Sequence, residues 1–193
     1  MPMQTIRTFF AIELPTLTLE HIEKELSDLK NSIPWKIKWV AISSMHITIK
    51  FIGEFNLEHQ SSIQKDLQSH LIELGEIKLS FEKIGVFPNI KKPRVAWLGL
   101  NGPEQLIELA RTVNLIASNY GYTHEKRNFS PHLTLGRVRN NVSSRDRELI
   151  GQKITNYRFT EIEPFITNRL SFIKSSLTPQ GPVYSTLFET PFL

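Results

Sequence analysis

Cysteine is absent from this 193-residue chain. Its absence excludes disulfide bonds, a thiolate zinc site and a cysteine nucleophile, and is compatible with any redox compartment. The chain also lacks a run of about eighteen apolar residues, and residues 1–7 lack the apolar core of a secretory signal. We therefore expect neither a membrane span nor secretion, and the cytoplasm is the expected location.

Two common signatures of phosphate chemistry are also missing. There is no Gly-x-x-x-x-Gly-Lys-Ser/Thr loop, which argues against a transferase that consumes ATP. Neither His46 nor His132 belongs to a His-x-x-x-His motif or has acidic residues near it at the spacing of metal ligands, which disfavours a metal hydrolase. The sequence therefore predicts chemistry without a metal and without another cofactor.

What the chain does contain is a tetrad, His-aliphatic-Thr-aliphatic, at residues 46–49 and again at 132–135. Alternate side chains of a strand point to opposite faces, so each copy buries two aliphatic residues and presents an imidazole beside a hydroxyl. One such strand is typical of an ordinary polar sheet face. Its repetition favours a duplicated unit, in which two imidazoles and two hydroxyls would supply an acid, a base and two anion donors.

The parity of the two strands makes further predictions. In a regular strand Lys50 shares the face of His46, and we expect it to face solvent. Arg137 has the parity of Leu133 instead, so it reaches the face of His132 only if a bulge is permitted at Gly136.

Secondary-structure patterns come in two similar sets. Apolar spacing predicts helices over 17–33, 56–75 and 103–121 and a short helix from 143. A connector at 177–182, rich in proline and glycine, is expected to be a loop. Strands are predicted at 8–14, 36–42, 46–52, 77–87, 94–100, 122–126, 158–162, 166–174 and 183–188. The repeated order predicts two α+β lobes that face one another across a groove.

The formal charge of +4 is modest but unevenly distributed. The segment 124–147 is basic, since it holds Lys126, Arg127, Arg137, Arg139, Arg145 and Arg147 against Glu125 and Asp146. Such a basic segment would attract phosphate-bearing ligands in a salt-dependent way, or it would simply be a solvated surface.

The two tetrads, together with residues 7–12, 87–89 and 181–184, resemble the two-histidine phosphoesterase superfamily. Within it the chain is most similar to the bacterial 2′-5′ RNA ligase type, also described as RNA 2′,3′-cyclic phosphodiesterase. The resemblance implies an α+β, bilobal, duplicated fold with pseudo-twofold symmetry, in which antiparallel sheets line a central groove and helices pack outside. It implies one two-lobed phosphoesterase domain over residues 1–193.

The resemblance also implies a reaction. The family hydrolyses a terminal RNA 2′,3′-cyclic phosphate to a 2′-phosphomonoester, and it is also described as joining 2′-5′ RNA ends. Carried over, His46 is the proton donor, His132 is the proton acceptor, and Thr48 and Thr134 bind the phosphate. The implied partner is an RNA or oligonucleotide with a cyclic phosphate end, and we expect a monomer that makes no membrane contact. Further candidates for phosphate or base contacts are Arg127, Phe129, Arg137 and Tyr184.

Two alternatives stay open at this stage. A non-catalytic RNA-binding module would account for the basic segment, but it gives no reason for duplicated histidines. A phosphoesterase that acts on another cyclic nucleotide would use the same groups on a different ligand.

Exhaustive chelation should leave turnover of a 2′,3′-cyclic phosphate unchanged, because the tetrads provide proton transfer without ligand-spaced partners for a metal. The measurement is the hydrolysis rate before and after dialysis against a chelator. Loss of activity that an added divalent ion restores would contradict the acid–base assignment of His46 and His132.

Overall fold

The computed structural model describes residues 5–33, 36–101, 103–179 and 181–192. Its helices are α1 (Thr16–Ser32), α2 (Gln60–Leu71), α3 (Glu104–Asn119) and α4 (Ser144–Asn156), with short 3₁₀ turns η1 (Ile42–Ser44) and η2 (Leu57–His59). Its strands are β1 (Thr5–Glu13), β2 (Ile37–Trp39), β3 (His46–Asn56), β4 (Ile77–Phe87), β5 (Val95–Asn101), β6 (His132–Val138), β7 (Phe165–Thr167), β8 (Arg169–Thr178) and β9 (Gly181–Pro191).

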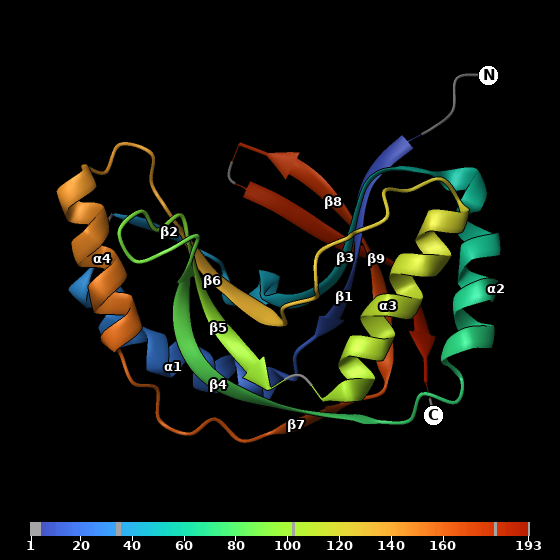
Figure 1. Ribbon diagram of the computed structural model, residues 1–193, viewed down its shortest axis with the longest axis horizontal. Coiled ribbons are helices and arrows are strands. Elements are labelled where there is room, and N and C mark those ends of the chain that lie inside the picture. Colours follow the sequence, from blue (N-terminus) through green and yellow to red (C-terminus); the bar gives the residue numbers. More distant parts are fainter. Residues whose placement is uncertain (1–4, 34–35, 102, 180, 193) are drawn as a thin grey trace.

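The strands form one curled antiparallel sheet in the order β7-β4-β5-β6-β3-β1-β8-β9, and β2 adds to β6 (Figure 1). The two tetrad strands, β3 and β6, are neighbours at its centre. Their pairing joins Ile47 to Leu133, which are the second residues of the two tetrads. An antiparallel pair that joins equivalent residues of two repeats has an approximate twofold axis between them. The predicted α+β duplicated fold with pseudo-twofold symmetry is therefore confirmed.

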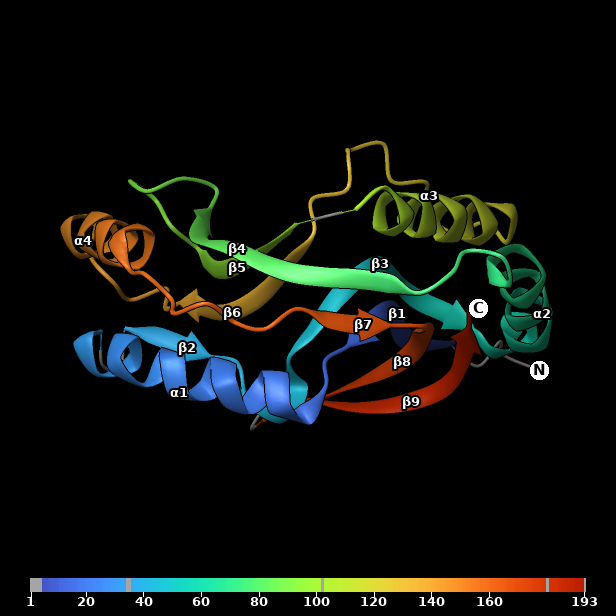
Figure 2. The same cartoon turned by 90° about the horizontal axis from the view of Figure 1, so that it is seen from below.

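Helices cover the outside of the sheet at its two ends (Figures 1 and 2). α2 and α3 pack together at one end, and α1 and α4 lie at the other. A hydrogen bond joins the latter pair, since Lys153 Nζ of α4 donates to the Ser32 carbonyl oxygen of α1 at 3.0 Å. Each end thus combines one helix from each half of the sequence.

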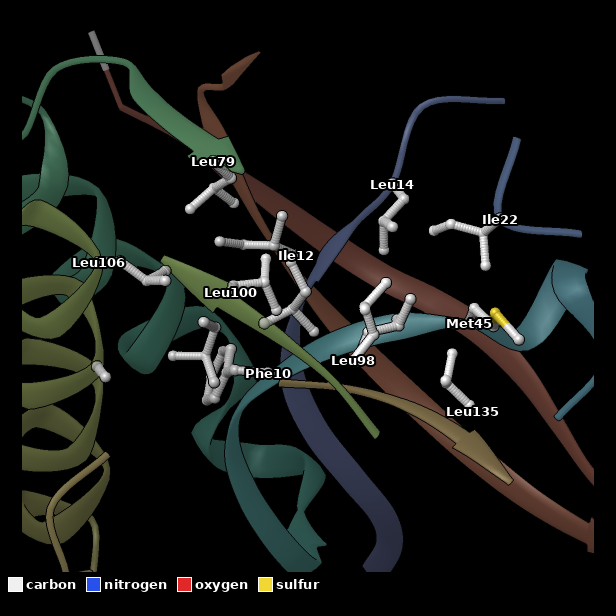
Figure 3. Packing of buried hydrophobic residues seen from close by; sticks show 14 of the residues in the cluster. Phe10, Ile12, Leu14, Ile22, Met45, Leu79, Leu98, Leu100, Leu106 and Leu135 are labelled. Carbon is white, nitrogen blue, oxygen red and sulfur yellow. The ribbon is translucent and has the colours of Figure 1, made fainter. Parts of the chain in front are cut away.

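The main hydrophobic core lies on the face of the sheet opposite the tetrad histidines. Phe10 and Ile12 of β1 are fully buried there, and Leu98 and Leu100 of β5 lie beside them (Figure 3). Ile47 and Leu133 are also fully inaccessible. Burying one such side chain stabilises a fold by roughly 1.5–3 kcal/mol, so the aliphatic half of each tetrad contributes to folding.

A β-bulge interrupts both tetrad strands at the same place. In β3, Phe10 pairs with Lys50 and Ala11 pairs with Thr48, so Ile49 is the extra residue. In β6, Ala96 pairs with Gly136 and Trp97 with Thr134, so Leu135 is the extra residue. Because a bulge shifts the alternation by one residue, every side chain beyond it moves to the other face.

Several sequence expectations are wrong in detail. The strands predicted at 122–126 and 158–162 do not form, because side chains satisfy those backbones. Asn114 binds both the N–H and the carbonyl of Glu125, and Glu25 accepts from Thr160 N at 2.8 Å.

Other strand boundaries also differ from the prediction. The segment 36–42 forms only the short strand β2, and 166–174 is divided between β7 and β8. β3 runs on past Gly53, whose φ of 81° accompanies a second bulge. The connector at 177–182 is mostly strand, since β8 continues to Thr178 and β9 begins at Gly181, with Gln180 outside the described residues.

Candidate active site

Each tetrad histidine is the first residue of its central strand, His46 of β3 and His132 of β6. The pairing of Ile47 with Leu133, continued along the strands, sets His46 across from Thr134 and His132 across from Thr48. One hollow is lined by His46, Thr48 and Thr134, and an adjoining hollow is lined by Thr48 and His132. We call them the His46 hollow and the His132 hollow, and together the active groove.

Both imidazoles are held in the same way. His46 Nδ1 lies 2.9 Å from the Ser44 carbonyl oxygen, and His132 Nδ1 lies 2.8 Å from the Ser130 carbonyl oxygen. A carbonyl only accepts, so Nδ1 carries the hydrogen in both rings and Nε2 is the nitrogen left for proton transfer. The serine two residues before each histidine extends the repeat to Ser-x-His-x-Thr, a signal that the tetrads alone do not include.

The surroundings of the two rings differ. His46 stacks on Phe9 with ring centroids 4.6 Å apart and meets the edge of Tyr184 at 5.2 Å. Burial lowers the pKa of His46, although the hydrogen bond to Ser44 and the charge of Glu13 oppose this. His132 lies against Phe87, in an edge contact at 5.2 Å.

The wall beside His132 depends on two glycines. The Trp97 indole stacks on Phe87 at 5.0 Å and covers Gly85, where a Cβ atom would collide with the indole ring. Gly99, which pairs with His132, lies under the same indole. The absence of side chains at Gly85 and Gly99 thus gives Trp97 the room to support Phe87 and, through it, His132.

The secondary candidates divide between the two hollows. Arg137 and Tyr184 line the His46 hollow, whereas Arg127 and Phe129 line the His132 hollow. The bulge that Arg137 requires is present, with Leu135 as the extra residue directly before Gly136. Burial raises the pKa of Tyr184, and the positive charges of Arg137 and Arg7 oppose the shift.

Known proteins resemble this chain over nearly its whole length. A family model described as LigT-like phosphoesterase matches residues 17–97. The RNA 2′,3′-cyclic phosphodiesterase of Methanocaldococcus jannaschii is 32% identical over 185 residues, which cover 95% of this chain and 99% of that protein. The Archaeoglobus fulgidus protein of the same name is 33% identical over 186 residues, 94% of this chain and 98% of its own. The chain belongs to the LigT-like phosphoesterase family.

Solved structures of this family have the same fold. Escherichia coli LigT in its apo form superimposes with a TM-score of 0.76 at 23% identity, covering 98% of both chains. The family model and the relatives at 32% and 33% identity confirm the resemblance to two-histidine phosphoesterases that the repeated tetrads indicated.

The phosphoesterase groove contains side chains that the sequence patterns did not single out. Phe9, Trp39 and Phe51 give the His46 hollow an aromatic lining, and the Arg7 guanidinium lies 4.7 Å from the centre of the Phe51 ring. Phe51 faces the groove because of the bulge at Ile49, and it holds the place in β3 that Arg137 holds in β6. Only the repeated bulge could have revealed it, and a bulge leaves no clear signal in the residues themselves.

The expectation for Lys50 is wrong. Lys50 is 5% exposed, and its Nζ donates to the Thr123 carbonyl oxygen at 2.6 Å. The bulge at Ile49 turns it away from the face of His46. Burial lowers the pKa of Lys50, opposed by the negative charge of Glu125. Its bond to Thr123 fixes the segment that leads to Ser130 and His132.

The basic segment does not form one surface. Lys126 and Arg127 line the His132 hollow, whereas Arg139 and Arg145 line a separate hollow beside α4. Arg147 is used structurally, since its guanidinium donates to four backbone carbonyls.

The described residues of this phosphoesterase contain no group of three or more His, Cys, Asp or Glu side chains placed to hold a metal ion. None of the helices in the described ranges is long and apolar enough to cross a bilayer.

Replacing Phe9 with Ala should raise the pKa of His46 toward the ordinary value of an imidazole. Burial disfavours the charged ring, and removing the stacked phenyl would admit water to it. Titration of the His46 ring resonances by NMR measures the shift. Phe87→Ala, which removes an aromatic neighbour of His132 only, serves as the control. An unchanged or lower pKa of His46 in folded Phe9→Ala would contradict the assigned cause.

Proposed function

We propose that this protein hydrolyses a terminal RNA 2′,3′-cyclic phosphate to a 2′-phosphomonoester, with His46 and His132 as its acid and base. One observation carries the proposal. The two imidazoles begin equivalent central strands, and each has Nδ1 held by a backbone carbonyl so that Nε2 is left for the groove. Relatives about 30% identical over nearly the full length are named RNA 2′,3′-cyclic phosphodiesterases, which supports this substrate.

The approximate twofold axis suits in-line displacement at phosphorus. A phosphate bound near the axis, between Ile47 and Leu133, would have one imidazole on each side. In-line attack needs the nucleophile and the leaving group on opposite sides of the phosphorus atom. Thr48 and Thr134 hold the other two positions around the axis, each across from a histidine, where their hydroxyls would donate to the non-bridging oxygens.

Two proton transfers complete the reaction. His132 Nε2 takes a proton from water as the water oxygen bonds to phosphorus. The bond from phosphorus to O3′ breaks, and His46 Nε2–H gives its proton to O3′, which leaves the phosphate on O2′. The division of roles rests on the family resemblance. The hydrogen bond to Ser44 and the negative charge of the bound phosphate would both favour the imidazolium that His46 needs, against the effect of burial.

The reverse direction exchanges the roles of the two histidines, so the same groove is suited to forming 2′-5′ RNA junctions. A monomer suffices for either direction, because one chain supplies both histidines and both threonines. We further propose one two-lobed domain, since the β3–β6 pair joins both halves into one sheet, and a cytoplasmic location.

His46→Ala and His132→Ala should each fold, still bind RNA, and lose about 10²–10⁴-fold in kcat/KM, the usual value of one proton transfer. The double variant should be scarcely worse than either single variant, because both transfers belong to one step. Thr48→Ala or Thr134→Ala should cost about 1–3 kcal/mol of transition-state stabilisation. Rates on a 2′,3′-cyclic mononucleotide, with ³¹P NMR of the product, provide the measurement. His70→Ala, which changes an exposed histidine of α2, is the matched control.

The wild-type pH profile should be bell-shaped, since one imidazole must be charged and the other neutral. Activity falls with rising pH as His46 loses its proton, and the lowered pKa of His46 places that limb at lower pH than a solvated imidazole would. Activity also falls at low pH as the base is protonated.

If either single histidine variant keeps near wild-type turnover, or if the protein binds RNA without opening the ring, a binding module becomes the better description.

A further inference from the structure

A third hollow, which we call the basic trough, adjoins the active groove beside α4. Its cationic side chains come from segments far apart in the sequence: β2, the β4–β5 loop, the end of β6 and the start of α4. Among the described residues that line it, Glu148 is the only acid. The cations used below are Lys38, Lys91, Lys92, Arg137, Arg139 and Arg145.

No salt bridge within the described residues pairs these cations. Salt bridges within the described ranges join Lys36 to Asp146 and Arg169 to Glu189, and neither uses a side chain of the trough. Asp146, the acid that follows Arg145, is already bound by Lys36 at 3.1 Å. A concave surface that holds six or more cations and, among its described lining residues, a single acid, Glu148, favours a polyanionic ligand.

The walls of the trough are fixed without a ligand. The Arg147 guanidinium donates to the carbonyls of Pro93, Arg139, Asn140 and Val142, and so ties the β4–β5 loop to the segment before α4. On the other side of that loop, the Ile90 backbone lies against Gly151 of α4 with no room for a Cβ atom between them. The loop that carries Lys91 and Lys92 is therefore held in place before anything binds.

Two cations join the trough to the active groove. Lys38 and Arg137 are directly paired across β2 and β6, and both line the trough and the His46 hollow. An anionic chain whose end lies at His46 would therefore pass over this pair into the trough.

We propose that the basic trough binds the phosphates of the RNA chain on the 5′ side of the cyclic end. The proposal rests on the proposed function, because the donor to O3′ sets the terminal ribose on the His46 side. From there the RNA chain leaves the active groove past Lys38 and Arg137, while the attacking water enters from the side of His132. The preferred substrate is then an oligonucleotide, and a cyclic mononucleotide engages only the active groove.

The test compares substrates of increasing length. We expect kcat/KM to rise from a 2′,3′-cyclic mononucleotide to oligonucleotides with one to five further 5′ nucleotides, and the rise to weaken with added KCl. The double variant Lys91→Gln/Lys92→Gln should lower the ratio of oligonucleotide to mononucleotide kcat/KM. It should also flatten the salt slope by about 1.4, since each lost contact to a single strand removes about 0.7.

Matched variants sharpen the result. Arg145→Gln, which lies on α4, tests the opposite wall and should lower the same ratio. Lys65→Gln removes the same charge from exposed α2 at the far end of the molecule and should keep the wild-type ratio and slope (Figure 1). Thermal unfolding of each variant by circular dichroism checks the fold.

Two outcomes would overturn the proposal. One is an unchanged ratio and slope in both trough variants. The other is a length dependence that disappears in Lys126→Gln/Arg127→Gln instead, because the chain would then leave past His132. Failure of the wild type to open any cyclic phosphate would reject the proposed function separately. Fluorescence anisotropy of a 2′-phosphorylated RNA oligonucleotide would still test the trough, since binding needs no turnover.

Discussion

The backbone pairing of Ile47 with Leu133 is the contact on which the rest of the structure depends. It closes the sheet between its two halves, and because it joins equivalent residues it also makes the two halves face each other symmetrically. The aliphatic side chains of this pair enter the core, and the histidines one residue earlier face the groove. Folding and placement of the two imidazoles thus depend on one local register, and a one-residue slip of either strand would turn the imidazole of that strand toward the core.

Symmetry of the backbone does not make the two halves chemically equal. The repeated bulges bring Phe51 to the groove in one half and Arg137 in the other. Thr48 lies opposite the small Ala11, whereas Thr134 lies opposite Trp97. Equivalent positions of the two halves therefore carry different side chains, an aromatic ring at Phe51 and a guanidinium at Arg137. Such a difference is what a duplicated site needs to bind a substrate that is itself asymmetric, with a nucleoside on one side of phosphorus and water on the other.

The sequence predicted the repeat, the central strands and the faces of the tetrads, because these depend on a period of two that the residues display. It did not predict Lys50, since one inserted residue reverses that period. It placed strands at 122–126 and 158–162, because local propensity does not reveal that Asn114 and Glu25 would bind those backbones. It did not predict the basic trough either, because charge patterns along a chain do not reveal its topology. Cations that are close together in the sequence line different hollows, whereas Lys91 and Arg145, far apart in the sequence, line the same one.

The carbonyl contacts of Ser44 and Ser130 also govern how the enzyme returns to its starting state. In the proposed mechanism one turnover leaves His46 neutral and His132 charged, so a proton has to return before the next. Each Nδ1 is committed to a backbone oxygen, and each ring can therefore release or gain a proton only through Nε2, on the side that product occupies. Departure of the product and reprotonation of the site are thus consecutive events that use the same opening.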